Sequence, residues 1–130
     1  MYLDSSPVDF DREYLVLNTR ISLQIQNALG MRGVTLGELR GRLVPALRDG
    51  RVVGRSYDEQ KGEMDVAVGV TLFYRAVLLE CVLTVTKTNQ VAPDGVKRIS
   101  YLTGFELVSI KQRSYSAKDD YFEEDTEYVE

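Results

Sequence analysis

The residues best suited to contact a charged ligand are arginines and lysines interleaved with tyrosines. Guanidinium and ammonium groups pair with phosphates, and tyrosine rings stack on bases. Because residues an even number apart along a strand share one face, Arg51, Arg55 and Tyr57 are expected on one side of a strand. The last strand is expected to place its basic residues and tyrosine on one face in the same way. Arg75 lies at the predicted reversal between two earlier strands. The candidate nucleic-acid-binding residues are Arg51, Arg55, Tyr57, Arg75, Lys97, Tyr101, Lys111 and Arg113. The alternative is a solvated sheet face, with tyrosines at positions that strands favour anyway.

The second candidate site is the acidic C-terminal segment 118–130, which holds seven Asp/Glu and one Lys. Residues 14–117 hold fourteen Lys/Arg and nine Asp/Glu, so a body with net charge +5 precedes this segment. Aromatic rings among carboxylates are typical of a docking peptide. The segment is therefore expected to bind a protein partner, or to fold back and mask the basic body, with a plain solubilising tail as the alternative. The candidate partner-binding residues are Tyr121, Phe122, Glu123, Glu124, Asp125 and Tyr128.

The residue inventory restricts the possible chemistry. The chain has no histidine and one cysteine, Cys81, so a zinc site or a histidine-activated nucleophile is not expected. The acids Asp58, Glu59, Glu63 and Asp65 cluster near a loop, but their spacing is not diagnostic of Mg²⁺. We expect no cofactor and no metal, and an enzyme only in the form of a metal-independent ribonuclease. With no signal peptide and no long apolar run, the sequence predicts a cytoplasmic protein that does not enter membranes.

Two helices are predicted in the first half of the chain. Apolar residues three to four apart favour a helix from about Asn18, and Gly30 and Gly33 end it. Thr35 followed by Glu38 is a capping-box pattern that starts a second helix. Pro45 is expected to kink or break that helix. The preceding segment "YLVLN" is compatible with a short strand.

After Gly50 the pattern is that of strands. Alternation or β-branched content predicts strands at 51–57, 64–73, 76–88 and 97–115, with a reversal at Tyr74–Arg75 and a turn at Pro93–Gly95. The fold class is therefore α+β, with two N-terminal helices packed on an antiparallel sheet of about four consecutive strands. The expected organisation is an irregular arm at 1–12, one domain at 13–117 and the acidic tail at 118–130.

The region 22–86 resembles the RelE/colicin-type ribonuclease-toxin superfamily. The resemblance rests on Ser22, Leu29, the run Arg32-Gly33-Val34-Thr35, Asp49-Gly50 before Val52-Val53, and the strand "ECVLTVTK". It implies a small α+β domain that acts on RNA. Gln24 stands where the motif would place histidine, and glutamine cannot exchange a proton near neutral pH. The second helix is also longer than is usual in the family. The resemblance thus supports the fold more than the activity.

Two functions from different classes remain. The first is a RelE-like domain that binds RNA or single-stranded DNA with weak or no catalysis, regulated or docked through its acidic tail. The second is a non-enzymatic protein-protein interaction or assembly protein, such as a phage accessory or virion structural component. Strands with a free edge could also pair between copies, so a homo-oligomer is possible.

Overall fold

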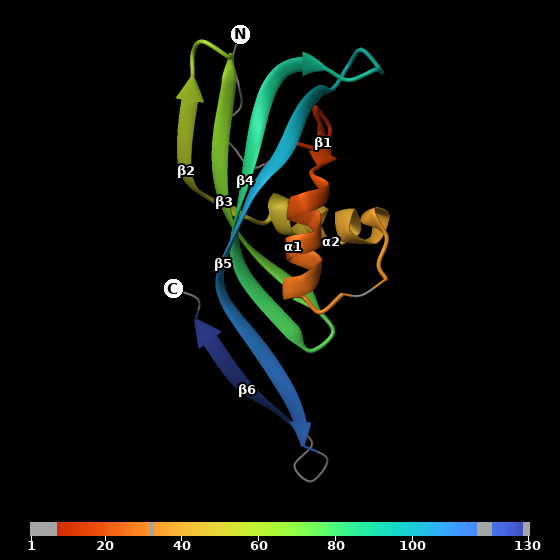
Figure 1. The fold of residues 1–130 in the computed structure, drawn as a ribbon, viewed down its shortest axis with the longest axis vertical. Coiled ribbons are helices and arrows are strands. Elements are labelled where there is room, and N and C mark those ends of the chain that lie inside the picture. Colours follow the sequence, from red (N-terminus) through yellow and green to blue (C-terminus); the bar gives the residue numbers. More distant parts are fainter. Residues whose placement is uncertain (1–7, 32, 117–120, 129–130) are drawn as a thin grey trace.

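The chain folds as two helices on one face of a six-stranded mixed sheet (Figure 1). The computed structural model describes residues 8–31, 33–116 and 121–128, and for 113–116 and 121–128 it describes the backbone. The helices are α1 (Thr19–Ala28) and α2 (Leu36–Arg48). The strands are β1 (Glu13–Leu17), β2 (Arg51–Asp58), β3 (Glu63–Tyr74), β4 (Val77–Val91), β5 (Arg98–Ser116) and β6 (Tyr121–Tyr128). Their order is β1-β5-β4-β3-β2, and β6 also pairs with β5.

The predicted sheet of four antiparallel strands is wrong in two respects. Strand β1 comes before the helices and runs parallel to β5, from the pair Glu13–Arg98 to the pair Leu17–Leu102. Strand β6 adds an antiparallel partner at the other end of β5. A parallel pair requires a crossover through other elements, and here both helices and three strands separate the two partners. The local pattern of "YLVLN" was compatible with this short strand, but it carried no sign of a partner that lies so far along the chain.

Both predicted helices are confirmed together with their caps. The Asn18 side chain accepts from the backbone N–H of Arg20 and of Ile21, and Thr35 Oγ1 accepts from the N–H of Glu38 at 3.1 Å. These bonds satisfy N–H groups that the first turn of a helix leaves unpaired. Helix α2 continues through Pro45 to Arg48, so the proline does not break it.

The core lies between the helices and the sheet face that they cover. Leu39, Leu43 and Leu47 of α2 are fully buried. They cover alternate β3 and β4 residues such as Val68 and Leu83. The intervening residues of these strands lie on the opposite face, which we call the open face. Neither α1 nor α2 combines the length and the hydropathy that crossing a bilayer requires.

A buried ion pair fastens β1 to the centre of the sheet. Lys87 Nζ lies 3.4 Å from Glu13 Oε2, and both side chains are less than a tenth exposed. Ser100 Oγ donates to Glu13 Oε1 at 2.7 Å, and the N–H of Asp9 donates to Glu13 Oε2 at 2.8 Å. Burying a charge is unfavourable unless it is paired and hydrogen-bonded, and Glu13 has both kinds of partner. This cluster therefore fixes the position of the first strand.

Candidate functional site

The predicted basic face on β2 does not form. Arg51 lies opposite Gly69, on the open face, whereas Arg55 lies opposite the buried Val66, on the helix-covered face. The cause is a β-bulge between Val52 and Gly54. One extra residue shifts the alternation of side chains, so even spacing no longer means a shared face. Tyr57 follows Arg55 to the helix-covered side of the sheet.

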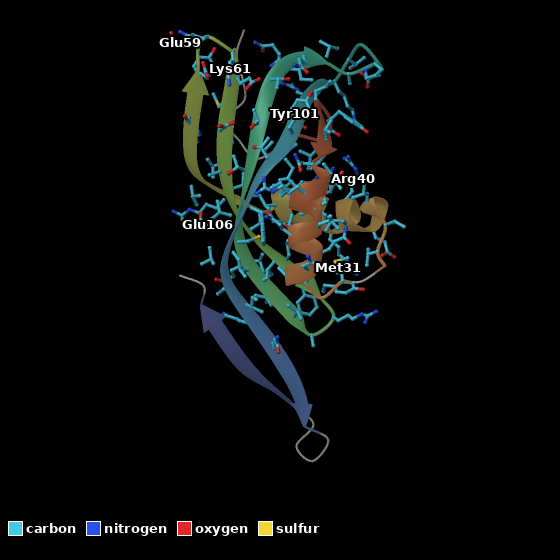
Figure 2. The ribbon with its side chains drawn as sticks, in the orientation of Figure 1. Met31, Arg40, Glu59, Lys61, Tyr101 and Glu106 are labelled. Atoms are coloured by element: carbon cyan, nitrogen blue, oxygen red, sulfur yellow. The ribbon has the colours of Figure 1, made fainter. Side chains whose placement is uncertain are left out.

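The remaining predicted residues are held by separate partners. Lys97 precedes β5, and its Nζ donates to the Phe10 carbonyl at 2.9 Å. On the open face, the Tyr101 hydroxyl donates to Gln90 at 2.9 Å, and Lys111 forms an ion pair with Glu80 at 3.6 Å. The side chain of Arg113 lies outside the described residues. Figure 2 shows Tyr101 on the upper stretch of β5, which also pairs with β1.

The acidic C-terminal segment pairs within its own chain. The register of β5 and β6 places Ser109 opposite Tyr128, Arg113 opposite Glu124 and Ser116 opposite Tyr121. Beyond Gln112, β5 has no β4 residue opposite it, so β5 and β6 continue as a two-stranded extension of the sheet (Figure 1). The side chains of the predicted docking residues lie outside the described residues. A protein partner for this segment stays a prediction.

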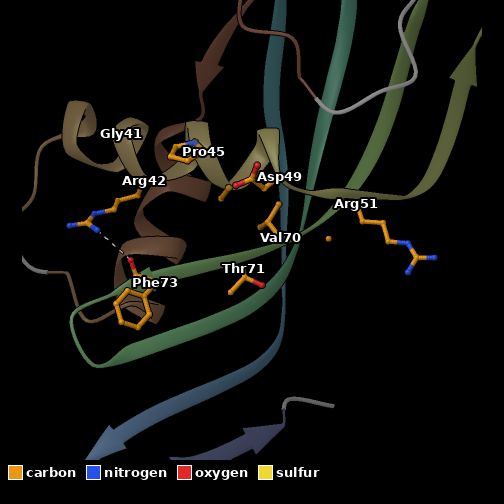
Figure 3. A pocket seen from close by; sticks show the side chains of 10 residues that line it. Gly41, Arg42, Pro45, Asp49, Arg51, Val70, Thr71 and Phe73 are labelled. Atoms are coloured by element: carbon orange, nitrogen blue, oxygen red, sulfur yellow. Dashed lines mark hydrogen bonds between the residues drawn. The ribbon is translucent and has the colours of Figure 1, made fainter. Parts of the chain in front are cut away.

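The arrangement best suited to binding is a groove between α2 and the lower half of β3, which we call the edge groove (Figure 3). Its volume is about 470 Å³. Helix α2 contributes one wall and β3 the other, and the lining includes the pair Arg51–Gly69, where β2 begins. The residues that line it are Gly41, Arg42, Pro45, Ala46, Asp49, Arg51, Gly69, Val70, Thr71 and Phe73.

The groove exists because β2 is shorter than β3. Strand β2 begins at Arg51, opposite Gly69, so residues 70–74 of β3 have no partner on that side. The chain reaches β2 from α2 through Gly50, where a Cβ atom would lie 2.5 Å from Val68 Cγ1 and 3.0 Å from Val70 Cγ1. Glycine thus allows the end of α2 to lie directly against β3. Toward the N-terminus of α2, the groove is lined by Gly41 and Pro45, whose small side chains leave it unfilled.

The open stretch of β3 presents backbone groups to the groove. A two-residue turn joins Tyr74 to Val77, so this pair is hydrogen-bonded and the pairs then alternate along the ladder. The N–H and C=O groups of Leu72 therefore point to β4. Those of Thr71 and Phe73 point to the free edge. Arg42 Nη1 donates to the Phe73 carbonyl across the groove at 3.5 Å, as this alternation requires (Figure 3).

Basic residues surround the groove. Arg42 lies over the Tyr74 ring at 5.1 Å, and Arg75, on the other side of the turn, lies over the same ring at 5.2 Å. Arg51 extends away from the groove toward the open face (Figure 3), and no hydrogen bond or ion pair ties its side chain to the described part of the chain. Asp49 is the one carboxylate in the lining. The local charge is therefore positive.

A second, shallower hollow of about 290 Å³ adjoins the edge groove on the open face. Val53 and Val108 stand at it, and both are extra residues of β-bulges, which leaves them 58% and 40% exposed. The two hollows share Arg51, Gly69, Val70 and Thr71. The surface at the free edge of β3 is thus continuous from the helix side to the open face.

Sequence patterns did not predict this site, although one signal for it exists. Pairing the predicted strands 51–57 and 64–73 back from their connecting loop leaves the last β3 residues without a partner. That count predicts a free edge, but not the helix beside it. Among the described residues, no group of three or more acids, cysteines or histidines is placed to hold a metal ion.

The buried side chains that could do chemistry have packing roles. Burial raises the pKa of the Cys81 thiol to about 12, so it stays protonated. Gln24 lies on the exposed side of α1, whereas Ser22 is fully buried and its hydroxyl has no partner in the described structure. The two residues that carry the start of the ribonuclease resemblance therefore face different surroundings.

No protein-family model matches the chain, and no curated protein or solved structure matches it either. The resemblance to RelE-type ribonucleases accordingly stays a prediction.

Proposed function

We propose that the protein is a non-enzymatic binding domain that captures an extended segment of a partner protein along the free edge of β3. The observation that carries the proposal is the pair of backbone positions Thr71 and Phe73, whose N–H and C=O groups point into the edge groove. A strand added to such an edge gains main-chain hydrogen bonds, and the neighbouring pocket selects its side chains.

The groove has the features that this mode of binding needs. Helix α2 stands beside the free edge, so an added strand would lie between a helix and a strand and would be covered on one side. Phe73 is 49% exposed and offers apolar surface at the end of the edge. The lining supplies one hydroxyl, one carboxylate and no thiol, which suits binding better than catalysis.

The test compares two proline variants. Thr71→Pro removes an edge N–H without removing a hydrogen bond to β4. The same alternation points the N–H of Tyr57 away from β3, so Tyr57→Pro makes the matching change at the outer edge of β2. We expect peptides selected on the wild-type protein from a random heptapeptide display library to lose binding to Thr71→Pro and to keep it on Tyr57→Pro.

Two outcomes would reject the proposal. One is a selection that enriches no peptide above the background on immobilised wild-type protein. The other is enrichment of peptides that bind Thr71→Pro as well as wild type, because these would use another surface. Circular dichroism and thermal unfolding establish that both variants are folded before binding is compared.

A second candidate function is binding of RNA or single-stranded DNA. The observation that favours it is the group Arg42, Tyr74 and Arg75, in which two guanidinium groups lie over one tyrosine ring. Such a group can contact a phosphate and a base together. Binding of single-stranded oligonucleotides that weakens steeply with salt and drops in Arg75→Ala would support this candidate. No binding at low salt would exclude it.

A further inference from the structure

We propose that the segment captured by the edge groove is an acidic peptide, rather than a nucleic acid or a second copy of this chain. This inference rests on the proposed function and names the chemistry of its partner. It is carried by the charges around the free edge of β3 and by the hydrogen-bonding pattern of that edge.

The charges favour a negatively charged partner. Arg42 stands beside Phe73 and Arg51 opposite Gly69, so the two arginines flank the open edge about four residues apart, roughly 13 Å. Arg75 adds a third positive charge at the turn. Asp49 on α2 is the single negative charge that lines the groove. A peptide with carboxylates near both ends would neutralise charges that have no acidic partner in the described structure.

The positions of the two arginines also predict a spacing. Arg42 approaches the edge from the helix side, whereas Arg51 lies on the open face (Figure 3). Carboxylates that meet both must lie on opposite faces of the added strand. Residues on opposite faces of a strand are an odd number apart, so acids three or five positions apart are expected. The intervening side chain on the helix side would meet Pro45 and Ala46, which favours a small apolar residue.

The edge pattern favours peptide over nucleic acid. Thr71 presents a donor and an acceptor and Phe73 presents a donor, while the Phe73 carbonyl already accepts from Arg42. An extended peptide satisfies both kinds of group. Phosphate oxygens only accept hydrogen bonds, so a DNA backbone would leave the Thr71 carbonyl unpaired, and an RNA backbone could pair it only through a 2′-hydroxyl. Asp49 in the wall would also repel phosphates.

The same charges argue against a second copy paired edge to edge. A two-fold pairing of the β3 edges is antiparallel, so it would bring Arg75 of each copy toward Arg51 of the other, which stands opposite Gly69. Like charges across an interface are unfavourable, and Asp49 alone cannot offset them. The partner is therefore a different segment, with the opposite charge.

The experiment adds a charge reversal to the display selection. Arg51→Glu changes a side chain that has no hydrogen bond or ion pair in the described chain, and Arg20→Glu makes the same change on the exposed surface of α1. We expect peptides selected on wild type and on Arg20→Glu to be enriched in Asp and Glu at odd spacing. We expect Arg51→Glu to lose that enrichment at one of the two acidic positions.

A chosen acidic peptide is then compared with its Gln-for-Glu analogue. We expect the analogue to bind about tenfold more weakly, a difference that raising NaCl to about 0.5 M should remove. Gly41→Phe, which fills the groove, should abolish binding of both peptides. Gly37→Phe places the same side chain on α2 outside the groove lining and should leave binding unchanged.

The possible outcomes separate the two proposals. Peptides that need Thr71 but show no preference for acids would overturn the acidic partner and keep the binding function. Failure to find any peptide whose binding depends on Thr71 would overturn both proposals. Displacement of the acidic peptide by single-stranded oligouridylate at lower concentration than by free peptide would also overturn the inference, in favour of nucleic acid.

Discussion

Helix α2 contacts two strand edges of the sheet, β1 on one side and the unpaired end of β3 on the other, and the two contacts differ. Arg40 donates to the Leu15 carbonyl of β1 and lies over the Tyr14 ring at 5.4 Å. Arg42 donates to the Phe73 carbonyl of β3 and lies over the Tyr74 ring. Residues two apart on a helix point to opposite sides, so the same arrangement, an arginine on a tyrosine and a strand carbonyl, is used once on each flank.

The two edges differ in how far the strand residues beside Arg40 and Arg42 are buried. At β1, Leu15 is fully buried and Glu13 is held by Lys87 and Ser100. At β3, Phe73 is half exposed, and the Arg42 side chain crosses the adjoining groove to reach the Phe73 carbonyl. The β1 edge is therefore closed by buried contacts, whereas the β3 edge keeps the N–H and C=O of Thr71 and the N–H of Phe73 available. We therefore expect the β3 edge to bind a partner and the β1 edge to contribute to the stability of the fold.

The largest expected effect is at the closed edge. Lys87→Met would leave the Glu13 carboxylate buried without its charge partner, and we expect the free energy of unfolding to fall by about 3–5 kcal/mol. Lys111→Met is the matched control, because its pair with Glu80 is partly exposed, and it should lose about 1 kcal/mol or less. Urea unfolding measures both. Equal losses would show that β1 is not anchored by its buried charges.

The next effect compares two glycines, Gly50 just after α2 and Gly41 in the lining of the edge groove. Gly50→Ala would place a methyl group 2.5 Å from Val68 Cγ1, and the overpacking should lower stability by about 1–3 kcal/mol. Gly41 has open space at its Cβ position, so Gly41→Ala should raise stability by about 0.5–1 kcal/mol through helix propensity. Thermal unfolding gives the two signs. A loss of stability in Gly41→Ala would mean that the groove is not open there.

These edges also mark how far the sequence could predict the structure. Local signals were sufficient for the helices, because Asn18 and Thr35 cap them through residues two or three positions away. The turn at Asp94 was likewise predictable, whereas the reversal between β3 and β4 lies at Arg75–Ala76, one residue later than predicted, and no Gly or Pro marks it. The Asp94 side chain accepts from the N–H groups of Val96 and Lys97, and these bonds lower its pKa.

The rest depended on contacts that no local pattern carries. In the sequence Val53 looks like an ordinary strand residue. Its β-bulge places Arg55 and Tyr57 on the helix-covered face, away from Arg51, so the predicted basic face does not form. The strand character of acidic β6 comes from pairing with β5, since Asp and Glu are poor strand formers. The edge groove required knowing that α2 lies beside the unpaired end of β3, which is a tertiary contact.

A third prediction uses Cys81, on the central strand β4 between the two edges. Burial raises the pKa of its thiol from 9.0 to about 12. Its contribution to stability is complete below pH 9 and is lost as pH rises through the window from about 9 to 12, because the unfolded thiol ionises first. We expect wild type to lose about 1 kcal/mol more per pH unit than Cys81→Ala in that window. Parallel slopes in urea unfolding would contradict it.

The smallest expected effect comes from comparing how much Arg40 and Arg42 each contribute to the free energy of unfolding. Arg40→Met removes a partly buried hydrogen bond and a cation–π contact at the closed edge, so it should lower the free energy of unfolding by about 1–2 kcal/mol. Arg42→Met removes the corresponding contacts where solvent can replace them, and should change stability by about 0.5 kcal/mol or less. Urea unfolding under identical conditions compares them.

The two variants should then exchange rank when the measurement is binding. Arg42→Met leaves the fold intact but removes a positive charge beside the free edge, so it should weaken an acidic peptide while Arg40→Met, once folded, binds as wild type does. A stability loss for Arg42→Met as large as that for Arg40→Met would show that α2 depends on both edges equally. In that case the β3 edge would be part of the structural frame, and the basis for assigning binding to it would be lost.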